Sequence, residues 1–218
     1  MQNSEIESAH ALENSADFVG ALRLYYAAYK RDSSDSDAVL GIAQNAMTLD
    51  NPELALEFFV KLLILDHRNP WGFLGRAQVM IRYNQVNRAV SDIRRAIDLD
   101  QPASDFRVDC AAALNDCGEC ESALEALAPI REDYGEDPDF CAEWIFASIA
   151  SGKGNDEISR MLDDCMKNSD DPLFELCYLA LHRSDDDRAQ VAQILKDAPD
   201  LEYRANLLFG TSIVTDVT

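Results

Sequence analysis

Alanine recurs in this sequence at one fixed interval, and this regularity limits the possible folds more than any other feature. Each repeat contains two such positions, twelve residues apart, and the two series are Ala9, Ala43, Ala77, Ala111 and Ala21, Ala55, Ala89, Ala123. Two small residues per repeat suit two crossing helices, because alanine lets their backbones approach closely. The interval predicts an array of helix pairs in which each pair packs on its neighbours.

Larger apolar residues follow the second alanine of each repeat at helical spacing. Four residues later stand Tyr25, Phe59, Ile93 and Leu127, and seven residues later stand Ala28, Leu62, Ala96 and Ile130. Residues spaced in this way share one face of a helix, which we expect to be buried. Polar residues, glycine and proline separate the expected helices, as in Asp50–Pro52 and Asp66–Pro70. Asp and Asn at these places can cap the helix that follows.

This pattern resembles the tetratricopeptide repeat, a helix-turn-helix unit of about 34 residues. The resemblance is clear over residues 4–136 and weaker over the degenerate repeats 137–200. It implies an all-α fold, a right-handed superhelical solenoid of about six helix-turn-helix pairs plus a terminal helix. The fifth pair is expected to carry one inserted residue before its second helix, and residues 201–218 are expected to form the terminal helix and a tail. We expect residues 1–218 to be a single domain.

Acidic residues dominate the charge of the chain. The sequence has 40 Asp and Glu against 19 Lys and Arg, which gives a net charge of −21. Such a surface cannot neutralise phosphates, so we expect no nucleic-acid partner and no docking on anionic membranes. The N-terminal residues lack the pattern of a secretory signal, and no apolar run is long enough to span a bilayer. We therefore expect a cytoplasmic protein without membrane insertion.

Acidic runs in the C-terminal third leave two interpretations open. The runs are Asp163-Asp164, Asp170-Asp171 and Asp185-Asp186-Asp187. The terminal repeats of a solenoid need a polar outer face, so these residues fit a solvated cap. They fit equally a docking patch for a basic partner.

The sharpest local motif is a pair of cysteines in the fourth repeat. Cys117-Gly118-Glu119-Cys120 has the spacing of a metal or redox pair, and Cys110 lies seven residues earlier. Zinc would need further ligands, and the chain has no second pair of this spacing. The repeat offers another explanation, in which the cysteines are small core residues and Gly118 forms the turn. We expect no metal and no cofactor, with a metal- or thiol-responsive sensor as the alternative.

Catalysis has little support in the sequence. His10, His67 and His182 are far apart, with no matched nucleophile. The sequence contains neither the G-x-x-x-x-G-K-[ST] nor the G-x-G-x-x-G phosphate-binding motif. We therefore predict that the protein is not an enzyme.

The resemblance implies that the first helix of each pair lines a concave face. Four positions around the first alanine of the repeat are expected to point inward, which gives Val108, Ala112, Asn115 and Asp116 in repeat four. The predicted peptide-binding groove lies in repeats two and three and comprises Leu40, Gln44, Met47, Trp71, Leu74, Gln78, Ile81 and Arg82. Apolar anchors and glutamine amides suit an extended or helical peptide. The alternative is that some of these residues pack between adjacent first helices.

These observations predict a protein-protein interaction scaffold, an adaptor or chaperone that binds a basic or amphipathic segment of a partner in the groove. One subtype of the repeat binds a C-terminal carboxylate with inward Lys, Asn and Arg, but the corresponding positions here are Leu40, Gln44, Leu74 and Gln78. A free C-terminal carboxylate is therefore not the expected ligand. The alternatives are a self-assembling structural subunit, which would be a homo-oligomer, and the thiol sensor described above.

Overall fold

The computed structural model describes residues 3–99, 105–182 and 187–210, and all of its regular elements are helical. The elements are α1 (Asn3–Asn14), α2 (Phe18–Arg31), α3 (Ser36–Thr48), α4 (Pro52–Leu65), α5 (Pro70–Arg82), α6 (Val86–Leu99), α7 (Phe106–Asp116), α8 (Cys120–Leu127), η1 (Ala128–Ile130), α9 (Arg131–Tyr134), α10 (Pro138–Ala150), α11 (Asp156–Asn168), α12 (Pro172–His182), α13 (Asp187–Asp197), η2 (Pro199–Leu201) and α14 (Glu202–Phe209). The all-α class, the six helix pairs and the terminal helix are confirmed. The predicted tail, residues 211–218, lies outside the described residues. No helix in the described ranges has the length and apolar character needed to cross a bilayer.

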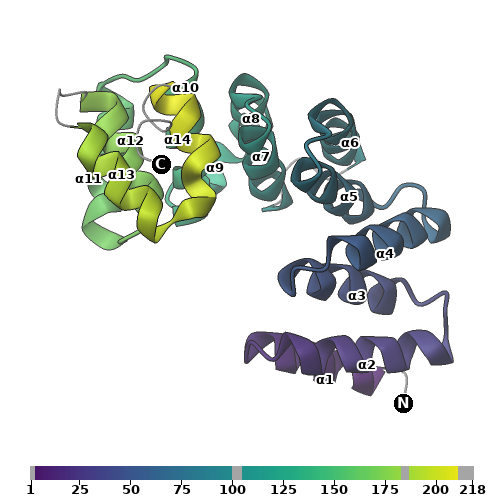
Figure 1. Cartoon of the computed structure of the whole chain (residues 1–218). Helices are drawn as coiled ribbons and strands as arrows, with labels where there is room; N and C mark the ends of the chain where they lie inside the picture. Colours follow the sequence, from purple (N-terminus) through teal and green to yellow (C-terminus); the bar gives the residue numbers. More distant parts are fainter. Residues whose placement is uncertain (1–2, 100–104, 183–186, 211–218) are drawn as a thin grey trace. The chain divides into compact units, whose positions relative to one another are not determined.

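The chain divides into two compact units, residues 1–100 and residues 101–218. The first unit contains the pairs α1/α2, α3/α4 and α5/α6, in which α2 packs on α3 and α4 packs on α5 (Figure 1). The second unit contains α7 to α14. Because each unit is compact in itself, the assignment of residues 1–218 to one domain stays a prediction.

The turn between the two helices of a pair repeats with the same period as the alanines. The backbone has a positive φ between 55° and 76° at Ala16, Asp50, Asn84, Gly118 and Gly152, which follow one another at the alanine interval. The amide that follows each of these residues donates to the carbonyl five residues before it, at 2.7–2.9 Å. This is the bonding of a helix that ends in a left-handed residue. The period therefore continues into the fifth pair, where the side-chain pattern had already weakened.

The repeated alanines form the helix crossings. All eight are 0% exposed, as the sequence predicted. In the first unit, a ring from one pair also packs on a glycine of the next pair. A Cβ atom added to Gly41 would lie 2.4 Å from the Tyr25 ring, and one added to Gly75 would lie 2.1 Å from the Phe59 ring. These two contacts are one repeat length apart, so the second and third pairs share this glycine contact.

The second unit departs from the regular repeat at two places. The second helix of the fourth pair breaks at η1, which contains Pro129, because proline lacks the amide hydrogen that the helix needs. In the fifth pair, Ile158 and Leu162 are buried one residue later than the period starting from Ala123 and Leu127 would place them. This confirms the predicted insertion.

Candidate functional site

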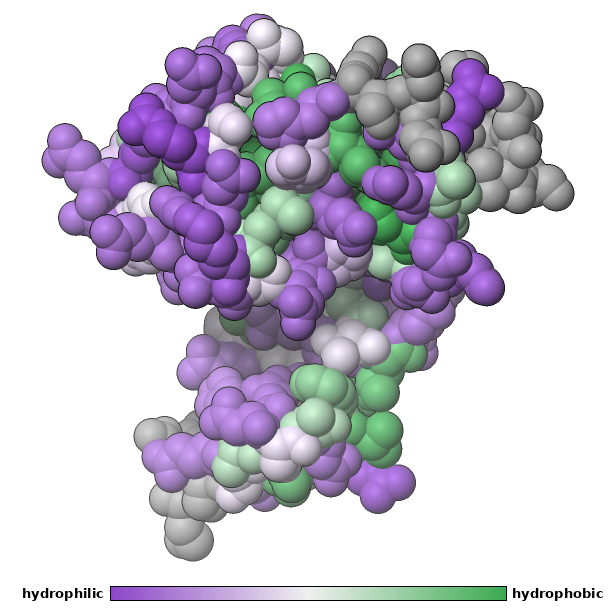
Figure 2. Space-filling model, turned by 90° about the vertical axis from the view of Figure 1, so that its left-hand side faces the viewer, coloured by the Kyte–Doolittle hydropathy of each residue, from purple (hydrophilic) through white to green (hydrophobic). Residues whose placement is uncertain are grey.

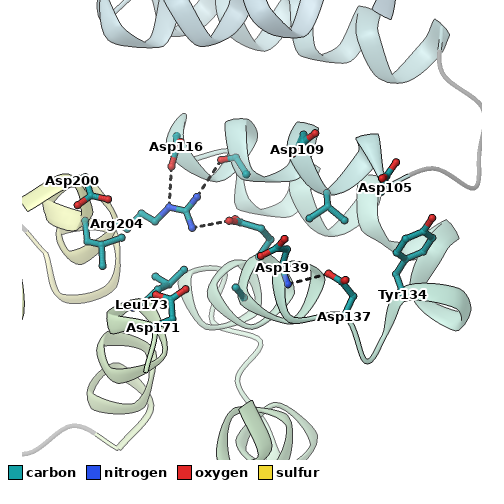
Figure 3. A pocket seen from close by; sticks show the side chains of 15 residues that line it. Asp105, Asp109, Asp116, Tyr134, Asp137, Asp139, Asp171, Leu173, Asp200 and Arg204 are labelled. Atoms are coloured by element: carbon teal, nitrogen blue, oxygen red, sulfur yellow. Dashed lines mark hydrogen bonds and ion pairs between the residues drawn. The ribbon is translucent and has the colours of Figure 1, made fainter. Parts of the chain in front are cut away.

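A cleft of about 680 Å³ opens in the second unit between α7 and α10, with the start of α12 and the segment η2–α14 as further walls (Figure 3). Its apolar lining includes Val108, Ala142 and Leu173. Eight carboxylates also line it: Asp105, Asp109, Asp116, Asp137, Asp139, Glu143, Asp171 and Asp200. Among the described lining residues, Arg204 is the one basic side chain. The cleft is therefore a partly apolar hollow with a strong negative potential.

Three of the carboxylates lie in the cleft because they cap helices. Asp105, Asp137 and Asp171 each accept a hydrogen bond, at 2.8–3.0 Å, from backbone amides at the start of α7, α10 and α12. Such side chains satisfy amides that have no partner within the helix, and the positive end of the helix dipole partly compensates their charge. These three aspartates thus have a structural role, and the distinctive charge of the cleft comes from the other five carboxylates.

Asp109 and Glu143 occupy a position of the repeat that is glycine in the second and third pairs and Glu7 in the first pair. Successive steps of one repeat length lead from Gly41 to Gly75, Asp109 and Glu143. In the second and third pairs this position receives an aromatic ring, whereas in the fourth and fifth pairs it carries a carboxylate that lines the cleft. Sequence reasoning missed both carboxylates, and the signal that could have found them is the change from glycine to acid between the third and fourth pairs.

The carboxylate of Asp109 is held among like charges. Partial burial in the cleft raises its pKa above the ordinary value, and the neighbouring Asp105 and Asp139 carboxylates raise it further. Figure 3 shows Asp109 on α7, Asp105 just before the start of α7, and Asp139 at the start of α10 on the other side of the cleft. A cation placed between them would relieve this repulsion.

Arg204 of α14 already occupies one end of the cleft. It is 8% exposed, and its Nε donates to Asp116 Oδ1 at 2.9 Å while Nη1 donates to Glu143 Oε1 at 3.0 Å (Figure 3). The guanidinium also lies 5.0 Å from the centre of the Phe146 ring. Burial would lower the pKa of Arg204, but Glu143 and Asp116 raise it above its ordinary value. The arginine is therefore held as a cation and is largely shielded from solvent.

Glu143 is the most enclosed carboxylate of the cleft, at 9% exposed. Burial raises its pKa, and Arg204 and Asn115 oppose this by favouring the ionised form. Asn115 Nδ2 donates to Glu143 Oε2 at 2.8 Å, whereas Asn115 Oδ1 is buried without a hydrogen-bond partner. Glu143 is thus a buried carboxylate that accepts hydrogen bonds from both the Asn115 amide and the Arg204 guanidinium.

The inward-facing positions predicted for repeat four agree with this site. Val108, Ala112 and Asp116 line the cleft, and Asn115 supports it through Glu143. The sequence thus placed these residues on the face of α7 that lines the cleft. It did not predict that α14 would lie against the same face.

The eight groove residues predicted in the first unit differ in their exposure. Trp71 is 37% exposed, and Gln44, Gln78 and Arg82 are also exposed, whereas Leu40, Met47 and Ile81 are half-buried. Leu74 is 1% exposed, so its side chain has little surface to offer a ligand. Leu40 and Met47 pack against the core of the unit, and Arg82 forms an ion pair with Asp50. Their role in binding a peptide stays a prediction.

The cysteines of the fourth repeat are buried. Cys110 is 0% exposed, Cys117 8% and Cys120 7%. Burial raises the pKa of Cys117 to about 11 and raises that of Cys120. Such thiols are poorly ionised at neutral pH, which suits small core residues better than reactive groups. Within the described ranges, no group of three or more His, Cys, Asp or Glu side chains is arranged to hold a metal ion.

Solved structures share the arrangement of helices. A thermophilic tetratricopeptide-repeat protein of Thermus thermophilus, TTC0263, is 17% identical over 99% of this chain and 100% of its own, with a TM-score of 0.61. A tetratricopeptide repeat protein of Parabacteroides merdae is 12% identical over 99% and 82%, with a TM-score of 0.64. The fold is that of tetratricopeptide-repeat proteins.

A third solved structure is YrrB, described as a tetratricopeptide-repeat protein with an unusual peptide-binding site. It is 22% identical to this chain over 78% of its residues and 88% of those of YrrB, with a TM-score of 0.54. No protein-family profile and no curated protein matches the sequence. At these identities the comparison establishes the tetratricopeptide-repeat fold and not a function.

Proposed function

We propose that the protein is an interaction scaffold that holds a basic segment of a partner protein in the acidic cleft of the second unit. One observation carries the proposal: the cleft already binds a guanidinium, that of Arg204, on Asp116 and Glu143. Further carboxylates line the remaining volume of about 680 Å³, which is within the range of ligand sites. A scaffold of this kind acts as an adaptor or a chaperone for the segment that it holds.

The lining of the cleft favours a segment that is both basic and apolar. Val108, Ala142 and Leu173 lie among the carboxylates, so the walls alternate in character. Arginine and lysine suit such walls because their apolar stems can pack while their charged ends reach a carboxylate. The peptide-binding site named for YrrB supports a peptide as the class of ligand.

A binding titration tests this proposal. A short, blocked, fluorescent peptide rich in arginine and leucine is titrated into the wild-type chain and into a variant with Asp109→Asn and Asp139→Asn. We expect the variant to bind about tenfold more weakly, because two charges that face the cation are lost.

A matched variant provides the control for general attraction to an acidic protein. Glu132→Gln with Asp133→Asn removes the same charge from exposed positions of α9 that do not line the cleft. We expect its affinity to stay within about twofold of wild type, since exposed charges are screened. Equal losses in the two variants would show that the cleft has no special role.

A second candidate site is the groove predicted in the first unit. The observation in its favour is Trp71, a large aromatic residue that is 37% exposed. If this surface anchors the peptide, Trp71→Ala weakens binding by about 2 kcal/mol or more, as at other interface centres. If the cleft is the site, the same variant binds the peptide normally.

A further inference from the structure

Helix α14 lies against the face of the second unit that lines the cleft. It contacts α7, α10 and α12. Three of its residues point inward, with Arg204 8%, Ala205 0% and Leu208 5% exposed. Glu202 and Tyr203, on the same helix, are exposed. The helix therefore has one buried side and is held by a small set of side chains.

The helix is too short to be stable without these contacts. It has 8 residues and follows the single turn of η2, and Leu201 at its N-cap makes no side-chain capping bond. Isolated helices shorter than about 12 residues are marginal in water, so packing must supply most of the stability of α14. Elements of this kind are among the first to open in a folded protein.

The contacts of Arg204 involve the ligand-facing positions of α7. Its Nη2 donates to the Ala112 carbonyl at 3.5 Å and its Nε donates to Asp116, which is 88 residues away in the chain. Both residues belong to the set that the repeat pattern places on the inward face. The chain thus presents an arginine on a helix at the place where a partner segment is expected.

We infer that α14 occupies in cis the place of an arginine-bearing helix of the partner, and that an arginine of the partner replaces Arg204 on Asp116 and Glu143. The inference rests on the proposed function, since it names the partner segment and the element that competes with it.

A partner residue that displaces Arg204 has to replace both its positive charge and its hydrogen bonds. If Arg204 left without a replacement, Glu143 would lose the cation that opposes the effect of burial on its pKa, and it would have to take up a proton or stay as an unpaired buried charge, either of which is unfavourable. Lysine would not substitute well, because the donors of Arg204 reach two carboxylates and a carbonyl at once while its planar group lies over Phe146. The incoming segment must therefore carry arginine, with apolar neighbours to replace Ala205 and Leu208.

The test uses a synthetic copy of the helix. A blocked, fluorescent peptide with the sequence of residues 199–210 is titrated into four full-length chains: wild type, Arg204→Gln, Leu208→Ala and Glu202→Gln. Arg204→Gln removes the arginine, and Leu208→Ala loosens α14 without changing any charge. Glu202→Gln is the matched control, since Glu202 lies on the exposed side of α14.

We expect the peptide to bind Arg204→Gln and Leu208→Ala about tenfold or more tightly than wild type, because the apparent affinity rises with the fraction of open clefts. Glu202→Gln should match wild type. A peptide in which the residue corresponding to Arg204 is lysine should bind Leu208→Ala about tenfold more weakly, since it cannot form the paired contacts.

Hydrogen exchange on the same variants shows whether α14 opens while the rest of the second unit stays folded. In Leu208→Ala, α14 should lose protection while α7 and α10 keep theirs. Collapse of protection in all three helices, or equal affinity of the peptide for wild type and Leu208→Ala, would overturn the inference and make α14 a structural cap. The proposed function fails on a different result, namely binding of the arginine- and leucine-rich peptide that is unaffected by the loss of Asp109 and Asp139.

Discussion

Asp109 lines the cleft among like charges, and this placement affects the stability of the second unit. Its pKa is raised by partial burial and by Asp105 and Asp139, so its ionised form is disfavoured in the folded chain. A carboxyl with a raised pKa favours the folded state at low pH, and this contribution is lost as the pH rises through the folded-state pKa. At neutral pH, ionised Asp109 therefore destabilises the fold.

We predict that Asp109→Asn stabilises the chain at pH 7 by a few tenths of a kcal/mol, about the size of other solvent-screened charge effects. The same variant should bind the basic peptide more weakly. Urea unfolding at pH 7 and at a pH below the ordinary Asp value checks the first part, because the gain should shrink in acid. A loss of stability at pH 7 would mean that the carboxylate is favourably paired.

Gly75 shows a residue whose role is steric. A Cβ atom at this position would lie 2.1 Å from the Phe59 ring, so Gly75→Ala should destabilise the first unit by about 1–3 kcal/mol, as other overpacking changes do. Thermal or urea unfolding measures this cost. In a Phe59→Ala background the cost should largely disappear, because the ring that causes the clash is gone. Additive losses would show that the glycine is needed for another reason.

At the scale of elements, the turn within each of the first five pairs places one residue in the left-handed region of the backbone, which is unfavourable for a residue with a Cβ atom. Ala16 has a φ of 60°, a conformation that costs a residue with a Cβ atom about 1 kcal/mol. We predict that Ala16→Gly stabilises the chain by about that amount. Ala11→Gly, in the exposed interior of α1, should instead destabilise it by about 1 kcal/mol. Comparing the unfolding of the two variants checks the sign, and destabilisation by both would contradict the role assigned to the turn.

The sequence predicted the helix pairs well because each pair carries its own local signals. Alanine spacing recurs in the first four pairs and capping residues and turns continue into the fifth, so even the one-residue insertion of the fifth pair could be located. The position of α14 could not be predicted in this way. Its contact with α7 joins residues 88 apart, and nothing in the local pattern around Arg204 indicates which face it covers. The cleft was missed for the same reason, since its walls come from four separate segments.

At the scale of the whole molecule, charge should control how fast a basic partner arrives. The net charge is −21, and hydrophilic residues cover most of the face drawn in Figure 2. We predict that the association rate of the basic peptide falls by about tenfold or more from low to physiological salt, because steering is screened. The dissociation rate should change little, since the contacts in the cleft are short-range and partly apolar. Stopped-flow measurement of both rates checks this, and a salt effect confined to dissociation would be inconsistent with steering.

The central claim is that a partner segment binds in the cleft of the second unit. A hydrogen-exchange footprint of the full chain with and without the arginine- and leucine-rich peptide tests it most directly. We expect bound peptide to protect α7, α10 and the start of α12, and to leave α3 and α5 unchanged. Protection of α3 and α5 around Trp71, with α7 and α10 unaffected, would contradict it and place the binding surface in the first unit.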